Sequence, residues 1–115
     1  MLKKIYRLKE KEVKKVLSKS KPFFSYGIVL NKTKNNLNYN RFAIVIWSKS
    51  VKNNVERVFF RRKFYNFVKD YIFLSKNWFL NFVFVVKKQN KLDKKDITSI
   101  KWFEKDLEFL IKKIK

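Results

Sequence analysis

The sequence predicts an α+β fold, a two-layer sandwich whose elements follow the order helix, strand, strand, helix, strand, helix. Three observations predict it. Two stretches, one near each end of the chain, space their apolar residues at the period of an amphipathic helix. A central stretch repeats aromatic residues at the same period, and the runs between these stretches have the aromatic and branched composition of strands. No repeat and no linker rich in Pro, Gly or Ser divides the chain, so residues 1–115 are expected to form one domain.

The first half of the chain is expected to hold one helix and two strands. Over residues 4–19 the apolar positions fall within one half of a helical wheel. Pro22 blocks continuation of this helix, and the run 23–30 predicts a strand. The polar segment 31–38 predicts a turn that joins this strand in a hairpin to a second strand over residues 39–47. Because both faces of the second strand are apolar, it is expected at the centre of the sheet.

The second half adds a helix, a strand and a final helix. Residues 56–72 are predicted to form a helix with one narrow apolar face. That face carries Phe60, Phe64, Phe67, Val68 and Tyr71. The run 78–86 predicts a buried strand, and residues 94–115 predict an amphipathic helix with Asp93 or Asp96 as its cap. A strand, helix, strand unit of this kind usually has parallel strands and a right-handed crossover.

The charge balance predicts a polyanionic partner. The chain has 30 Lys and Arg against 9 Asp and Glu, a formal net charge of +21, and a positive field of this size attracts nucleic acid. Genomic drift toward Lys and Asn would explain part of the lysine content, but drift would also enrich the acids. The 46% apolar content, with 13 Phe, is too high for intrinsic disorder.

The residues that are missing exclude several kinds of site. Without Cys and His there is no disulfide, no thiolate zinc site, no cysteine nucleophile and no imidazole base. The single glycine excludes a Gly-rich phosphate loop, and the acids offer no paired carboxylates. We therefore expect no catalytic residue, no metal site and no small-molecule substrate. The chain start is no signal peptide, and no apolar run approaches the ~20 residues of a membrane helix, so a cytoplasmic location and no membrane partner are expected.

What remains is a set of basic residues interleaved with aromatic ones. Arg57, Arg61 and Arg62 fall at the start of the central helix, where guanidinium groups can bind phosphates bidentately; the alternative is a solvated helix face. Aromatic residues on the first two strands can stack on unpaired bases, although core positions are the commoner role of such residues. These aromatic residues are Phe24, Tyr26, Tyr39 and Phe42.

The segment 48–64 resembles the signature of the bacterial ribonuclease P protein subunit. Ser48-Lys49-Ser50-Val51 precedes Val55-Glu56-Arg57 and then Phe60-Arg61-Arg62. This order is similar to the family pattern of Ser-Lys-Lys-Val-Gly, then Val-x-Arg-Asn, then a basic pair. The chain departs from that pattern at Ser50, Lys52 and Val58. The resemblance extends from Arg7-Leu8-Lys9 in the first helix to the final helix.

The resemblance implies a fold like domain 2 of ribosomal protein S5, with a left-handed crossover in place of the right-handed default. It also implies that the partners are the catalytic RNA of ribonuclease P and precursor tRNA. The RNA, with Mg²⁺, would remove the 5′ leader of the precursor, and the chain itself would hold no catalytic residue and no cofactor. The residues implied to bind RNA are Ser48, Lys49, Lys52, Arg57, Arg61 and Arg62. The residues implied to line a leader-binding cleft are Phe24, Tyr26, Tyr39, Val13 and Leu17, the last two at positions where the family has aromatic residues.

Two other classes of function stay open on the sequence. A small ribosomal or other basic RNA-binding protein without a role in cleavage fits the charge and the fold class equally well. A membrane-active basic protein would use the first or last helix. Both helices carry acids among their lysines, which disfavours a surface adapted to anionic lipid.

Overall fold

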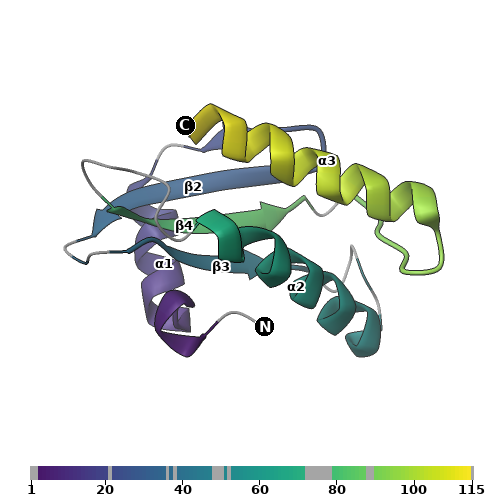
Figure 1. The fold of residues 1–115 in the computed structure, drawn as a ribbon, viewed down its shortest axis with the longest axis horizontal. Coiled ribbons are helices and arrows are strands. Elements are labelled where there is room, and N and C mark those ends of the chain that lie inside the picture. The colour runs from purple at the N-terminus through teal and green to yellow at the C-terminus, as the bar shows by residue number, and fades with distance from the viewer. Residues whose placement is uncertain are drawn as a thin grey trace.

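The computed structural model describes residues 3–20, 22–35, 37, 39–47, 51, 53–71, 79–87 and 90–114. In these residues the chain forms three helices and a four-stranded mixed sheet, with a single 3₁₀ turn at Lys4–Tyr6 and another at Lys69–Tyr71 (Figure 1). The helices are α1 (Glu10–Lys19), α2 (Asn54–Val68) and α3 (Ile97–Ile114). The strands are β1 (Phe23–Phe24), β2 (Ile28–Asn35), β3 (Arg41–Val45) and β4 (Phe79–Val86). The predicted α+β class and order of elements are confirmed, with β1 as an additional short strand.

The sheet has the order β1-β2-β4-β3, so the last strand of the chain lies between β2 and β3. β4 pairs antiparallel with β2 from Ile28↔Val86 to Asn35↔Phe79, and parallel with β3. The predicted hairpin between the first two long strands is therefore wrong, and so is the central place given to residues 39–47. β3 is an edge strand that is apolar on both faces because helices lie on both sides of the sheet. Residues 31–35, predicted as a turn, continue β2 because each of them pairs with β4.

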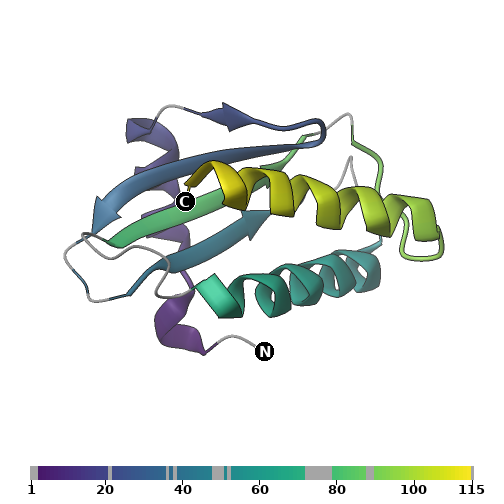
Figure 2. The same ribbon diagram turned by 45° about the horizontal axis from the view of Figure 1, so that its top comes forward.

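The β3–α2–β4 unit makes a left-handed crossover. In Figure 2, β3 and β4 run in the same direction and α2 lies in front of the sheet. Viewed from the helix side with both strands pointing upward, β4 lies to the left of β3, whereas a right-handed unit would place it to the right. The default expectation of a right-handed crossover is thus replaced by the unusual hand that the resemblance implied.

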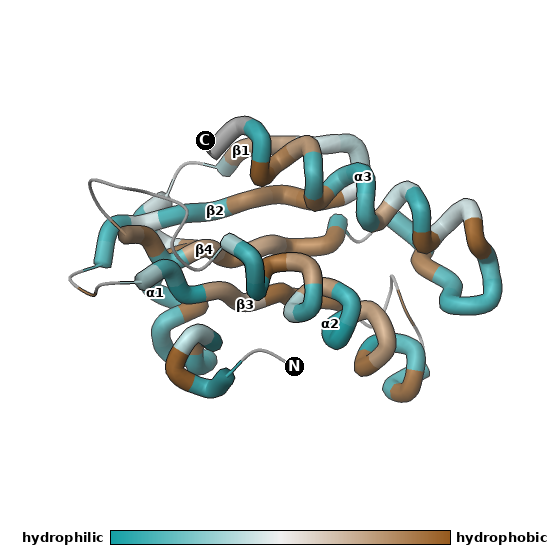
Figure 3. Tube along the Cα trace, viewed as in Figure 1, coloured by the Kyte–Doolittle hydropathy of each residue, from teal (hydrophilic) through white to brown (hydrophobic). Residues whose placement is uncertain are grey.

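The period of two in the strands divides the core between the two faces of the sheet. Phe82, Phe84 and their neighbours on β2 and β3 face α2 and α3, in one large cluster with Phe60, Phe64 and the apolar stripe of α3. The opposite face is smaller, with Ala43 and Val83 packed against Leu8 and Val16 of the N-terminal segment. Figure 3 shows the strands as largely apolar where the helices cover them. The sheet with α2 and α3 forms two layers, and α1 crosses the other face (Figure 1).

Helix boundaries follow local capping. The first helix begins at Glu10 rather than at residue 4, because Arg7 forms a bridge with Phe42 and the Leu8 N–H donates to the Phe42 carbonyl at 2.9 Å. α2 begins at Asn54, where the Asn53 side chain accepts the Val55 N–H. At the start of α3 the Asp96 carboxylate accepts the Thr98 N–H at 3.0 Å, as predicted for a cap.

Phe64→Ala tests the large cluster between α2 and the sheet. The Phe64 side chain is fully buried, and its ring lies 5.0 Å from that of Phe84. Its loss should lower the free energy of unfolding by about 3–5 kcal/mol through lost burial and the cavity left behind. Urea unfolding followed by circular dichroism measures this. The matched control, Phe24→Ala at an exposed aromatic position, should cost less than about 1 kcal/mol; equal losses would place the core elsewhere.

Candidate RNA interface

The arginines of α2 lie on the side of the helix that faces away from the core, but they are not equivalent. The Arg57 side chain is half-buried, and its guanidinium donates to the Val51 carbonyl at 2.6 Å. Val51 is itself buried, and its N–H donates to the Trp47 carbonyl at 3.2 Å. Arg57 therefore fastens the segment before α2 to the helix. The candidate residues Ser48, Lys49 and Lys52 belong to that segment and lie outside the described residues.

Arg61 and Arg62 are both exposed and diverge around the helix. Arg61 lies one turn before Tyr65, and Arg7 comes from the N-terminal segment to place its guanidinium 5.7 Å from the centre of the Tyr65 ring. Burial raises the pKa of Tyr65, and the positive charges of Arg7 and Arg61 oppose that rise. Arg7 thus joins the basic side of α2. No local pattern in the sequence predicts this contact, because Arg7 and Tyr65 are far apart in the chain.

Arg62 lies on the outer flank of α2, beside a hollow of about 530 Å³. Lys63 and Lys94 also line this hollow, together with the apolar side chains of Val55 and Phe59. The Lys63 ammonium forms an ion pair with Glu104 of α3 at 3.3 Å, which ties the two helices together. Basic groups therefore lie on both sides of α2. On the side of Arg62, the apolar side chains of Val55 and Phe59 lie among the basic ones.

The face of the sheet crossed by α1 holds three of the five residues predicted for a leader cleft. Val13 is partly buried against Val16 and the valines of the sheet, and Leu17, one turn further along α1, is 40% exposed. Phe24 of β1 is opposite Val29 in the register and is 58% exposed. The Lys87 ammonium lies 5.5 Å from the centre of the Phe24 ring. This face combines exposed apolar side chains with a cation.

The other two residues predicted for the cleft lie apart from this group. Tyr26 contacts Trp102 of α3, and α3 packs on the opposite face of the sheet. Tyr39 precedes β3 and lies edge-on against Tyr6, with ring centres 5.0 Å apart. The predicted grouping assumed a hairpin between the two strands, which does not exist.

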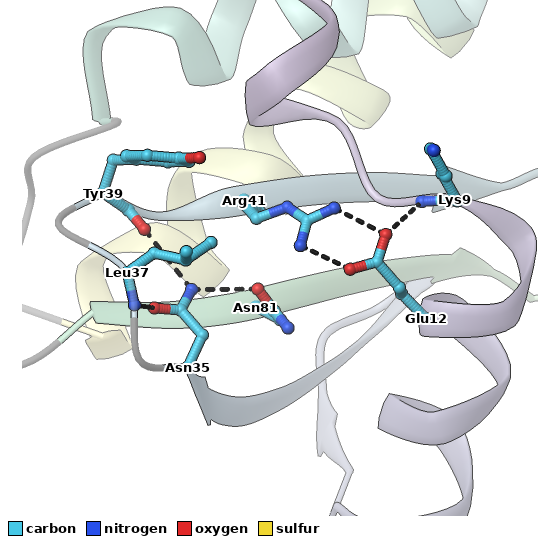
Figure 4. Close-up of polar contacts among 7 residues, drawn as sticks. All are labelled: Lys9, Glu12, Asn35, Leu37, Tyr39, Arg41 and Asn81. Atoms are coloured by element: carbon cyan, nitrogen blue, oxygen red, sulfur yellow. Dashed lines mark hydrogen bonds and ion pairs between the residues drawn. The ribbon is translucent and has the colours of Figure 1, made fainter.

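A carboxylate–guanidinium pair fixes α1 on the sheet. Both oxygens of Glu12 accept hydrogen bonds from Arg41 of β3, and one of them also accepts the Lys9 N–H at 3.1 Å (Figure 4). The hydrogen bonds from Arg41 hold the pKa of Glu12 below its ordinary value, more than burial raises it. Nearby, the Asn35 amide donates to Asn81 at 2.9 Å and ties β2 to β4 (Figure 4). Arg41, although basic and near the surface, therefore has a structural role.

The residues that the structure describes hold neither a cluster of metal ligands nor a membrane-spanning helix. In that part of the chain, no three acidic side chains come together as they would around a metal ion. None of the helices described there is long and apolar enough to cross a membrane.

The left-handed crossover, the mixed sheet and the helices on both faces define a basic α+β protein with the unusual crossover that the resemblance implied. A family model described as Ribonuclease P matches residues 2–115. The chain therefore belongs to the ribonuclease P protein family. It is a protein subunit of a ribonucleoprotein endoribonuclease of tRNA processing, and its family implies ribonuclease P RNA as a partner.

Solved structures show the same fold. The RNase P protein of Staphylococcus aureus, at 20% identity, gives a TM-score of 0.74 with 96% of this chain and 95% of that chain covered. A mutant of the same protein, described as defective in mRNA degradation activity, gives 0.74 at 20% identity, with 95% and 87% covered. The RNase P protein from Thermotoga maritima, in complex with 1-(4-fluorophenyl)-2-thiourea, gives 0.64 at 20% identity, with 87% and 91% covered. No curated protein matches the chain in sequence.

Glu12→Gln tests the pair that fixes α1. It should lower the free energy of unfolding by about 1–2 kcal/mol near pH 7, since it removes hydrogen bonds between two charged groups. The folded-state pKa of Glu12 lies below its ordinary value of 4.5, so the stabilisation is complete above that value and is lost as the pH falls through the folded-state pKa. In urea unfolding between pH 7 and 3, the wild-type and variant curves should therefore converge at the acid end. Glu10→Gln, at an exposed acid paired within α1, is the control; a difference that does not change with pH would contradict the assignment.

Proposed function

We propose that this chain binds the catalytic RNA of ribonuclease P through the arginine side of α2 and assists endonucleolytic removal of the 5′ leader from precursor tRNA. The observation that carries the proposal is the exposed pair Arg61 and Arg62 on the crossover helix of a chain of this family. Guanidinium groups bind phosphate oxygens bidentately and keep their charge at every physiological pH. Ser48, Lys49 and Lys52, which precede α2 in the sequence, belong to the same proposed surface.

The separate roles proposed for the chain and for the RNA follow from the amino-acid composition of the chain. With a net charge of +21 and no His or Cys, the chain is suited to neutralising phosphates rather than to moving protons. In this proposal the RNA and its Mg²⁺ carry out the hydrolysis, and the chain contributes no catalytic residue and binds no cofactor itself. Its positive surface replaces part of the screening that Mg²⁺ otherwise supplies to closely spaced phosphates. The same proposal places the chain in the cytoplasm, where this family normally works.

The α1 face of the sheet is the proposed path of the single-stranded leader. Leu17 and Phe24 offer exposed apolar surface there, and Lys87 places a cation beside the Phe24 ring. Bases of a single strand bind to such surfaces by stacking and by apolar contact, and the backbone follows the cations. Val13 and Leu17 contribute aliphatic contact where the family has aromatic residues. The leader would therefore be held more by apolar burial than by stacking on α1.

Arg61→Lys combined with Arg62→Lys tests the arginine side of α2. The double variant keeps both charges but loses the bidentate geometry, so RNA binding should weaken by roughly 1–3 kcal/mol. Filter binding of ribonuclease P RNA at fixed salt measures the change. The control, Lys101→Gln with Lys112→Gln on exposed positions of α3, removes two charges and should have a smaller effect. If the control weakened binding as much as the arginine variant, the contact would be spread over the whole basic surface.

The activity is tested by cleavage of precursor tRNA as a function of Mg²⁺ concentration. The chain alone should not cleave. Added to its cognate ribonuclease P RNA, it should lower the Mg²⁺ concentration needed for leader removal. The variant with Arg57, Arg61 and Arg62 all replaced by Ala should lose this effect.

Circular dichroism of the triple variant checks that the fold is retained, and Arg61→Ala with Arg62→Ala provides a variant that spares the Arg57–Val51 contact. Superimposable Mg²⁺ curves for RNA alone, with wild type and with the variants would remove the assisting role. RNA binding without any effect on cleavage would instead favour a basic RNA-binding protein that has no part in the reaction.

A further inference from the structure

The turn between β1 and β2 forms a second aromatic surface with the outer side of α3. Tyr26 and Trp102 lie with ring centres 5.8 Å apart and planes tilted by 33°, and they are 83% and 51% exposed. Phe109, two turns after Trp102, is 48% exposed, and Lys105 places its ammonium 5.3 Å from the centre of the Trp102 ring. We call Tyr26, Trp102, Lys105 and Phe109 the aromatic platform. Grouped aromatic side chains that remain this exposed are typical of binding surfaces.

The aromatic platform lies apart from the arginines of α2 and adjoins the leader path only at the β1–β2 turn, where Lys87 donates to the Tyr26 carbonyl at 3.2 Å. Trp102 and Glu104 are two positions apart on α3, so they point to nearly opposite sides of the helix. Glu104 faces α2 through its ion pair with Lys63, which places Trp102 on the side away from the arginines. α3 packs on the face of the sheet opposite to α1. In Figures 1 and 2 the β1–β2 turn runs beside α3, where Tyr26 reaches Trp102.

The turn is held in place before any ligand binds. Asp106, one turn after Trp102 on α3, is buried and accepts the Gly27 N–H at 3.2 Å. Gly27, the only glycine of the chain, lies so close to the Asn90 side chain that a Cβ atom there would collide with it. A side chain at this position would displace the Asn90 side chain, which donates to the Gly27 carbonyl at 3.2 Å. Because the backbone of the turn is fixed, the Tyr26 ring already lies beside Trp102. A ligand that binds there therefore needs to order little more of the chain.

Two hollows flank the Tyr26–Trp102 pair and differ in chemistry. One, of about 320 Å³, is lined mainly by apolar atoms and includes Phe109 and Lys105. The other, of about 400 Å³, is lined by polar side chains that include Asn90, Thr98 and Ser99. A nucleotide site needs rings on which a base can stack, amide and hydroxyl groups that bind the edge of the base, and an ammonium group that binds a phosphate. The two hollows and the aromatic pair hold groups of all three kinds.

We propose that the aromatic platform binds an unpaired nucleobase of single-stranded RNA, with Lys105 contacting an adjoining phosphate. The site would be a second RNA contact, on the α3 side of the β1–β2 turn. The carboxylates of Asp96 and Asp106 line the polar hollow and accept the backbone N–H groups of Thr98 and Gly27, and Lys91 and Lys105 line the two hollows beside them. The net charge of +21 favours RNA over a cationic or neutral partner. The inference rests on the proposed RNA-binding function, and its test separates the two.

The test uses the full chain labelled with 5-fluorotryptophan and titrated with octa-adenylate. Trp102→Phe identifies the Trp102 signal in the fluorine NMR spectrum, and fluorescence anisotropy of labelled octa-adenylate gives the affinity independently. The Trp102 signal should shift saturably with octa-adenylate and shift far less with an abasic sugar-phosphate chain of equal length, which can contact Lys105 but cannot stack on the rings. Tyr26→Ala should weaken binding at the aromatic platform, followed by the Trp102 signal, roughly 5- to 150-fold, the effect of losing one stacked base, whereas Tyr26→Phe should bind as wild type. Ile97→Ala, at another exposed position of α3, is the matched control and should have no effect.

Each alternative result overturns the proposal in a recognisable way. If octa-adenylate binds while the Trp102 signal stays unmoved, the aromatic platform is not an RNA site and the proposed function still stands. If neither octa-adenylate nor ribonuclease P RNA binds, the proposed function fails and the platform proposal fails with it. If Tyr26→Ala leaves RNA binding intact but changes the molar mass found by light scattering, the surface contacts a second copy of the chain. Unfolding curves of the variants check that the fold is retained.

Discussion

The pairing of β4 with both of its neighbours is the constraint on which the rest of the structure depends. β4 pairs antiparallel with β2 over its whole length and parallel with β3. Its pairing therefore fixes the register of β2, β3 and β4 relative to one another. Because side chains alternate between faces, that register places Phe82 and Phe84 toward α2 and α3 and Val83 toward α1. A slip of one residue would exchange the two faces and place phenylalanine rings where the smaller α1 cluster has no room for them. The parallel pair also requires a crossover between β3 and β4, and α2 supplies it.

The surfaces proposed to meet RNA are therefore positioned by contacts that have no part in binding. Glu12 and Arg41 fix α1 across the sheet, Glu104 and Lys63 join α3 to α2, and Asp106 holds the β1–β2 turn. Arg57 belongs to both categories, since its guanidinium fastens Val51 while its helix carries Arg61 and Arg62 outward. Substitution of Arg57 would disturb the segment before α2 as well as remove a charge.

The sequence predicted those features that depend on local spacing. It predicted the apolar stripe of α2, the cap at Asp96 and the buried strand β4, but not the cap at Asn53, because the central helix was expected to begin only at residue 56. Strand partners could not be predicted. A strand with apolar residues on both faces can lie at the edge or at the centre of a sheet when helices cover both sides of that sheet. The contact of Arg7 with Tyr65 and the contact that separates Tyr26 from the α1 face could not be predicted either, because each joins residues that are far apart in the chain. The hand of the crossover came from the family resemblance, since general packing rules favour the opposite hand.

The distribution of charge explains how so basic a chain folds at all. A net charge of +21 on 115 residues destabilises the compact state by self-repulsion, and the few acids lie largely where they join elements or cap helices. The folded state therefore depends on the phenylalanine-rich cluster around α2 and α3, whose burial does not weaken with charge. A polyanion bound to the folded chain would relieve the repulsion and shift the equilibrium further toward the folded state in proportion to its concentration and affinity. The proposed binding of RNA and the stability of the fold would thus be coupled in this chain, because the same excess of positive charge that opposes folding favours a polyanionic partner.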